Sequence, residues 1–259
     1  MDALHIIILG IVEGITEFLP VSSTGHLVVV ADWLGISDTV FLPSFTIAIQ
    51  LGAILAAGVL YIKKVTEQPE IIARVFIAFV PTAVVGFTLY KYIRPLLNNV
   101  TISIVAIIVG GIIMIVVEKW LEKKNPAETT ITESPMPSWK QSLYIGLYQV
   151  ISFIPGVSRS AATIIGGLLH NMSRTASVEF SFLLAIPTMM AATGYDMLKS
   201  GWSFTGDQWG ALLLGGIVSF ITALVVMKLF LRYVQKYNLV PFGIYRIVLG
   251  VAFVFIFII

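Results

Sequence analysis

Six apolar stretches of membrane-spanning length constrain the fold of this chain more than any other feature. A helix needs about 17–25 predominantly apolar residues to cross the hydrocarbon core of a bilayer. The stretches that meet this requirement lie near residues 44–62, 72–91, 100–118, 180–198, 210–228 and 241–259. Only 12% of the 259 residues are charged, whereas soluble domains carry about 25%. The sequence therefore predicts an all-α polytopic membrane protein.

Two further apolar regions, residues 3–34 and 141–170, are interrupted halfway by helix-breaking residues. Pro20 interrupts the first region, and Pro155-Gly156 interrupts the second. Proline cannot donate an intrahelical hydrogen bond, so it ends or kinks a helix. Each region is therefore predicted to form a re-entrant hairpin, in which two short helices enter the membrane and leave it on the same side.

The two halves of the chain resemble each other. A polar linker at residues 121–140 separates a first repeat, residues 1–120, from a second, residues 141–259, within the single membrane domain 1–259. The matches at one constant offset pair Phe18-Leu19-Pro20 with Phe153-Ile154-Pro155, Ser23 with Ser158, Phe45-Thr46 with Phe180-Ser181, and Ala56-Ala57 with Ala191-Ala192. Single matches between apolar sequences mean little, and it is the co-linear order of these pairs that indicates a repeat.

The distribution of basic residues predicts how the repeats are oriented. Each half holds one hairpin and three spans, and an odd number of crossings inverts the second half relative to the first. One face of this topology collects Lys63, Lys64, Arg74, Lys119, Lys123, Lys124, Lys140, Arg174, Lys228, Arg232 and Lys236. The opposite face collects Lys91, Arg94 and Lys199. Because cytoplasmic loops are enriched in Lys and Arg, we expect an inverted-topology repeat with six transmembrane helices plus two re-entrant hairpins. The linker would be cytoplasmic, both termini would lie outside, and the hairpin tips would meet near the midplane, where such proteins build their sites.

A polar run from Glu13 to His26 lies inside the first broken region. A charged side chain at the bilayer centre costs about 2.5–3.5 kcal/mol even on lenient insertion scales, so these residues indicate a site. Glu13 and Glu17 are four residues apart and would share one helix face. Carboxylate oxygens suit Mg²⁺ or Ca²⁺, with phosphate completing the shell, which makes the pair a candidate metal site. The alternatives are a structural ion pair and side chains that snorkel to the external surface.

Three hydroxyls and an imidazole follow Pro20 in the same run. Ser22 or Ser23 can cap the second short helix, whose N-terminus would point into the membrane and attract an anion. Ser22 and Thr24 would then bind substrate or only satisfy backbone groups. Ser23 could be a nucleophile if a base lies near it. His26 could act as a general acid or base, attack phosphorus itself, or pack as a hydrogen-bonded side chain.

The second broken region carries a basic counterpart to this run. Ser158 can cap the helix that follows Pro155-Gly156, which places Arg159 at its tip, Ser160 beside it and Thr163 one turn further on. A guanidinium fork matches phosphate oxygens bidentately, and the flanking hydroxyls add donors. Alternatively, Arg159 is the internal counter-ion of Glu17.

Taken together, two carboxylates, an imidazole, several hydroxyls, a guanidinium and two inward helix N-termini favour phosphoryl transfer, where catalysis is mostly positioning and charge stabilisation. The chain has no Walker-type loop and no Cys, and its net charge of +2 argues against nucleic acid as a partner. Arg246, in the last apolar stretch, is expected to snorkel or to pair structurally.

At these residues the sequence resembles the bacitracin-resistance family of undecaprenyl-diphosphate phosphatases. The stretch from Glu13 to His26 matches that family's glutamate-rich motif followed by Pro-x-Ser-Ser-x-Gly-His. Residues 155–163 resemble its Pro-Gly-x-Ser-Arg-Ser motif, although Ala161 stands where many members have Gly.

The resemblance implies a phosphatase of the bacterial cytoplasmic membrane whose site opens to the external face. It would hydrolyse undecaprenyl diphosphate to undecaprenyl phosphate and inorganic phosphate, which recycles the lipid carrier for peptidoglycan synthesis and confers bacitracin resistance. By resemblance, Glu13 and Glu17 bind metal or act in acid–base steps, Ser23 and His26 are catalytic, and Arg159 holds the diphosphate. Its supporting hydroxyls would be those of Ser158, Ser160 and Thr163. The sequence leaves open whether the protein forms a homodimer. The alternative function is a transporter or flippase of a prenyl phosphate lipid.

Overall fold

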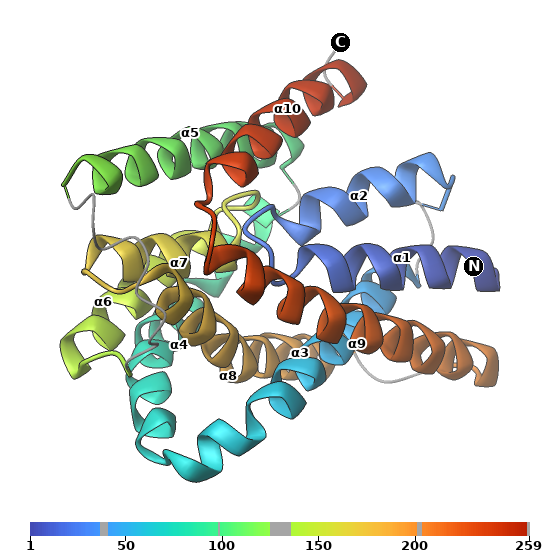
Figure 1. The fold of residues 1–259 in the computed structure, drawn as a ribbon. Coiled ribbons are helices and arrows are strands. Elements are labelled where there is room, and N and C mark those ends of the chain that lie inside the picture. The colour runs from blue at the N-terminus through green and yellow to red at the C-terminus, as the bar shows by residue number, and fades with distance from the viewer. Residues whose placement is uncertain (37–40, 98, 125–135, 201–203, 258–259) are drawn as a thin grey trace.

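The computed structural model describes residues 1–36, 41–97, 99–124, 136–200 and 204–257, and all regular structure in these ranges is helical (Figure 1). Six of these helices are long and apolar enough to cross a membrane. They are α3 (Leu42–Glu67), α4 (Glu70–Leu97), α5 (Val100–Lys124), α8 (Arg174–Ser200), α9 (Gly206–Val234) and α10 (Val240–Phe257). Each corresponds to one predicted apolar stretch, except that the last two residues of 241–259 lie outside the described ranges. The prediction of an all-α protein with six spans is confirmed.

Both ends of the predicted linker are helical. Helix α5 continues to Lys124, where a basic last turn interacts favourably with the negative end of the helix dipole. Helix α6 (Trp139–Val150) begins inside the same range, because Ser138 and Gln141 form a capping box at its start. Residues 125–135 of the linker lie outside the described residues.

Each broken region forms two short helices, and the breaks fall where Pro20 and Pro155-Gly156 predict them. The first pair is α1 (Ala3–Thr16) and α2 (Ser23–Trp33). In the second pair, α6 is followed by a single 3-10 turn, η2 (Ile151–Phe153), and then by α7 (Arg159–Leu169). The chain thus repeats one order of elements, two short helices followed by three long ones.

Small residues let the helices approach closely around the two breaks. Helix α1 lies along α9, α6 packs on α4, α3 contacts both α8 and α9, and α5 pairs with α10 (Figure 1). A Cβ atom at Gly52 of α3 would lie 2.2 Å from the carbonyl oxygen of Gly216 in α9. Gly146 of α6 approaches the carbonyl oxygen of Ala78 equally closely. Such contacts between backbones are typical of helix packing in membranes.

Candidate active site

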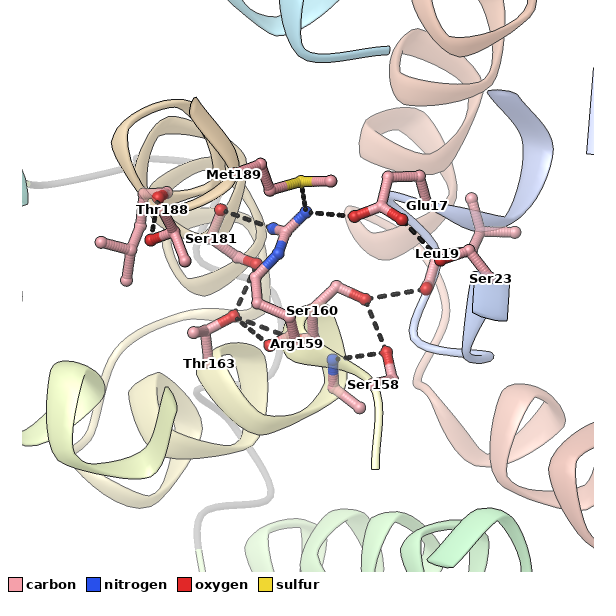
Figure 2. A network of polar contacts seen from close by, with 12 residues as sticks. Glu17, Leu19, Ser23, Ser158, Arg159, Ser160, Thr163, Ser181, Thr188 and Met189 are labelled. Atoms are coloured by element: carbon pink, nitrogen blue, oxygen red, sulfur yellow. Dashed lines mark hydrogen bonds and ion pairs between the residues drawn. The ribbon is translucent and has the colours of Figure 1, made fainter. Parts of the chain in front are cut away.

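The two loops that interrupt the broken regions lie against each other. The Ser160 hydroxyl, at the start of α7, donates a hydrogen bond of 2.7 Å to the carbonyl oxygen of Leu19 in the first loop (Figure 2). One guanidinium nitrogen of Arg246 donates both to Pro20 in the first loop, at 3.2 Å, and to Val157 in the second, at 2.9 Å. The two loops are therefore in contact, while their place in the membrane stays a prediction.

Each loop ends in a serine that holds the same uncommon backbone conformation. Ser22 precedes α2 with φ of 74°, and Ser158 precedes α7 with φ of 73°. Residues other than Gly or Asn rarely adopt positive φ, and such strain is concentrated at functional sites. The sequence comparison paired Ser23 with Ser158, but the helix starts pair Ser22 with Ser158, since the second loop has one more residue between its proline and its cap.

Only one of the two serines caps its helix with its side chain. The Ser158 hydroxyl accepts a hydrogen bond of 3.2 Å from the backbone N–H of Ala161, as predicted. The Ser22 side chain makes no capping bond, and the expectation that it or Ser23 would do so is wrong. The Ser23 hydroxyl points elsewhere, toward Glu17, because the carboxylate is the stronger acceptor.

Glu17 is the centre of a cluster that joins both loops (Figure 2). One carboxylate oxygen accepts a hydrogen bond of 2.5 Å from the Ser23 hydroxyl. The other lies 3.0 Å from a terminal guanidinium nitrogen of Arg159. Arg159 also donates to the carbonyl oxygen of Ser181 in α8, at 3.1 Å, and its remaining Nε is buried without a hydrogen-bond partner among the described residues. The counter-ion role of Arg159, left open by the sequence, is thus present in the structure.

The Ser23–Glu17 contact places a candidate base beside the Ser23 hydroxyl. A carboxylate oxygen 2.5 Å from a hydroxyl is within reach to accept its proton. Arg159 is the first residue of α7, and its guanidinium bonds to the other oxygen of the same carboxylate. A hydroxyl, a base and a guanidinium in this order can attack and stabilise a phosphoryl group.

Glu13 lies one turn before Glu17 on α1, and its side chain is fully buried. Neither of its carboxylate oxygens has a hydrogen-bond partner among the described residues. A buried carboxylate without a donor is costly unless a proton or a cation accompanies it. The oxygen donors of Glu13 and Glu17 therefore fit a hard divalent cation such as Mg²⁺ or Ca²⁺. No group of three or more His, Cys, Asp or Glu side chains gathers in the described ranges, so hydroxyl or phosphate oxygens would have to complete the shell.

His26 lies near this cluster but bonds to a different partner. Its Nδ1 is 2.8 Å from the carbonyl oxygen of Ser22, and its Nε2 is 2.6 Å from the hydroxyl of Tyr245 in α10. The two rings are also parallel, with centroids 5.7 Å apart. Both ring nitrogens are therefore engaged, and Tyr245 is a neighbour to which sequence reasoning gave no role.

The other predicted substrate-binding hydroxyls differ in how far they are available. Thr163 is fully buried, and its hydroxyl lies 2.6 Å from the Ser181 hydroxyl. Ser160 is buried, and its hydroxyl donates to the carbonyl oxygen of Leu19. The same hydroxyl oxygen lies 3.0 Å from the hydroxyl oxygen of Ser158. Thr24 is exposed on the first turn of α2. In this structure Ser160 and Thr163 hold Arg159 and the loops in place, and direct binding of substrate by these hydroxyls stays a prediction.

Arg246 does not snorkel but is fully buried. Of the two roles expected from the sequence, structural pairing is the one present, and its partners are main-chain carbonyls. Its guanidinium donates five hydrogen bonds of 2.9–3.2 Å to backbone carbonyls of both loops and of α5. The acceptors are Ala106, Ile107, Pro20, Gly156 and Val157. Gly110 of α5 leaves room for this guanidinium, since a Cβ there would lie 2.3 Å from an Arg246 nitrogen.

Comparison with known proteins agrees with the motifs. The sequence model of the bacitracin resistance protein BacA family matches residues 6–252. A protein of Aquifex aeolicus named undecaprenyl-diphosphatase is 49% identical, over 95% of both chains. Proteins of the same name from Persephonella marina and Wolinella succinogenes are 49% and 46% identical, over 98% of each chain. Because the match extends over nearly the whole chain, this protein belongs to the bacitracin resistance protein BacA family.

Proposed function

We propose that the chain is an integral membrane phosphatase that hydrolyses undecaprenyl diphosphate to undecaprenyl phosphate and inorganic phosphate. The observation that carries this proposal is the Glu17 carboxylate, which holds the Ser23 hydroxyl on one oxygen and the Arg159 guanidinium on the other. The names of its relatives agree with this activity. The product is the monophosphate carrier of peptidoglycan synthesis, so its recycling would also confer bacitracin resistance.

In the proposed reaction, the Ser23 oxygen attacks the terminal phosphorus while its proton passes to Glu17. The bond between that phosphorus and the bridging oxygen breaks, and the electron pair leaves with undecaprenyl phosphate. Water then attacks the phosphoserine, which releases inorganic phosphate and returns the proton to Ser23. Ser23 is favoured over His26 as the nucleophile because both His26 nitrogens are already engaged.

Arg159 and the helix N-termini would bind the diphosphate. The guanidinium carries a free Nε–H and can exchange its bond to Glu17 for phosphate oxygens. The N-termini of α2 and α7, which directly follow Ser22 and Ser158, add backbone donors for an anion. Glu13 and Glu17 would hold Mg²⁺ or Ca²⁺, which supplies charge neutralisation for the diphosphate when bound.

Substitution of the two candidate nucleophiles tests the mechanism. We expect Ser23→Ala to reduce phosphate release in detergent by about 10³-fold or more, because it removes the atom that bonds to phosphorus. His26→Ala should cost less, about 10²-fold, since it removes at most a proton transfer. The measurement is inorganic phosphate released from undecaprenyl diphosphate by the purified protein.

The reverse order of effects would contradict Ser23 as the nucleophile. If His26→Ala is inactive while Ser23→Ala retains activity, the imidazole or a water attacks instead. Movement of labelled lipid across vesicles, measured in parallel, separates hydrolysis from transport. A flippase needs no nucleophile, so lipid movement without any phosphate release by the intact protein would favour the transporter.

We further infer an inverted-topology repeat with re-entrant hairpins in the bacterial cytoplasmic membrane, a site open to the external face, and both termini outside. Three likenesses support this inference. The order of short and long helices repeats, Ser22 and Ser158 share a positive φ, and α1 packs on α9 as its counterpart α6 packs on α4.

Labelling of introduced cysteines tests the orientation, since the chain has none of its own. The exposed positions Trp33 and Lys123 lie on opposite faces of the inferred topology. We expect a membrane-impermeant maleimide to label Trp33→Cys in intact cells, and Lys123→Cys only after permeabilisation. The opposite pattern would reverse the orientation, and equal labelling in intact cells would contradict the inferred topology.

A further inference from the structure

Within the part of the chain that the structure describes, two sets of buried polar atoms have no hydrogen-bond partner where α1 meets α9. One set is the two carboxylate oxygens of Glu13 in α1, and the other is the hydroxyl of Ser219 in α9. Both residues are fully buried. A buried polar group without a hydrogen bond costs free energy, so an unpaired donor and an unpaired acceptor at one helix contact require an explanation.

Helices α1 and α9 lie side by side (Figure 1), and glycines let them approach closely at this level. A Cβ at Gly10 would lie 3.0 Å from the carbonyl oxygen of Gly215, and one at Gly14 would lie 2.7 Å from that of Ser219. Glu13 is adjacent to Gly14 and three residues after Gly10, so it belongs to the same turn of α1. The backbones therefore touch at the turns that carry Glu13 and Ser219.

The corresponding contact in the other half of the chain lies between α6 and α4. There the two residues that correspond to Glu13 and Ser219 are hydrogen-bonded to each other. A Cβ at Gly146 would lie 2.2 Å from the carbonyl oxygen of Ala78. Three residues after Gly146, the Gln149 amide donates a buried hydrogen bond of 2.8 Å to the hydroxyl of Thr82. Thr82 in turn lies four residues after Ala78.

The same two spacings, counted from the close contact between Gly10 and Gly215, identify Glu13 and Ser219. Three residues after Gly10 is Glu13, and four residues after Gly215 is Ser219. The hydroxyl is thus retained, while the amide is replaced by a carboxylate. A carboxylate can only accept, so here the hydroxyl has to be the donor, the reverse of the Gln149–Thr82 bond.

In the structure the Ser219 hydroxyl and the Glu13 carboxylate do not bond to each other. We propose that Ser219 is a positioning residue: when Glu13 binds a divalent cation shared with Glu17, the Ser219 hydroxyl donates to Glu13 and aims its carboxylate at the cation. The proposal rests on the cation site of the proposed function. It assigns a role to a residue of α9 that belongs to neither sequence motif. A hydrogen bond to a charged group fixes one carboxylate oxygen and leaves the other for the cation.

Cation binding without substrate tests this role independently of phosphatase activity. The full-length protein in detergent is titrated with Mg²⁺ and with Ca²⁺ in a calorimeter, for the wild type, Ser219→Ala, Ser219→Thr and Glu13→Gln. We expect Ser219→Ala to raise the cation Kd by about tenfold, the usual effect of a lost bond to a charged group. Ser219→Thr should restore the wild-type Kd to within about twofold, and Glu13→Gln should abolish binding.

Thr82→Val is the matched control, because it removes the equivalent hydroxyl from the other half. It should lower the Tm and leave the cation Kd unchanged. If Ser219→Ala binds the cation as tightly as the wild type while Glu13→Gln does not bind, the hydroxyl has no positioning role and the proposal is wrong. The proposal is also wrong if the wild type binds neither cation. Normal cation binding without phosphate release from undecaprenyl diphosphate would instead overturn the proposed function alone.

Discussion

Arg159→Lys is expected to reduce phosphate release by about 10²–10³-fold while the protein stays folded. Lysine keeps the positive charge beside Glu17, so the buried carboxylate retains a counter-ion. It lacks the planar fork, however, and cannot bind two phosphate oxygens or reach Ser181 and Met189 as Arg159 does. The measurement is the rate of phosphate release at saturating undecaprenyl diphosphate, with the Tm of each variant recorded in the same detergent.

Arg159→Ala is a poorer test, because it leaves Glu17 buried and unpaired. Removing one partner of a buried ion pair costs about 3–5 kcal/mol, so loss of activity could reflect unfolding. The double variant Glu17→Gln with Arg159→Met removes both charges and should recover part of the Tm while staying inactive. If Arg159→Lys instead hydrolyses substrate at the wild-type rate, the guanidinium is only the structural counter-ion of Glu17.

The Glu17–Arg159 pair could be predicted from sequence because intramembrane charges have few alternatives. A carboxylate and a guanidinium, each beside a proline break, are too costly to face lipid and must find each other or a ligand. The spans followed from hydropathy for a similar reason, since composition and length alone decide them. In both cases the cost of exposing a group or a stretch to lipid can be judged from the residues themselves, so the prediction needs no knowledge of the fold.

The features that the sequence did not predict depend on backbone geometry. Ser22 and Ser23 are both plausible residues at the N-cap position of α2, and only the positive φ of Ser22 shows that Ser22 occupies it and that the helix begins at Ser23. Arg246 was expected to snorkel or to pair structurally, but the sequence could not name its partners, because these are main-chain carbonyls, which every residue carries and no side-chain pattern marks. Likewise, nothing in the sequence singles out Ser219 until the contact between α1 and α9 is known.

Arg246→Met is expected to lower the Tm by roughly 10 °C or more and to abolish activity. The substitution removes five donors at once and takes away the Arg246 donors of the loop carbonyls of Pro20, Gly156 and Val157. Each unsatisfied group costs about 1–3 kcal/mol, and 1 kcal/mol corresponds to about 2–4 °C in a chain of this size. Methionine fills much of the same volume, so the loss reports the hydrogen bonds rather than a cavity.

The loss of activity should follow from displacement of the loops, because the five hydrogen bonds of Arg246 go to the loops and α5 and not to the Glu17–Ser23–Arg159 cluster. It bonds Pro20 on one side and Gly156 and Val157 on the other, and so fixes the two strained serines relative to each other. Arg246→Lys has too few donors to reach every carbonyl and should be intermediate in both Tm and rate. Arg232→Met, the same change at an exposed position of α9, should shift the Tm by no more than about 2 °C. An inactive Arg246→Met with the wild-type Tm would mean that Arg246 acts on the substrate, and would contradict its role in joining the loops.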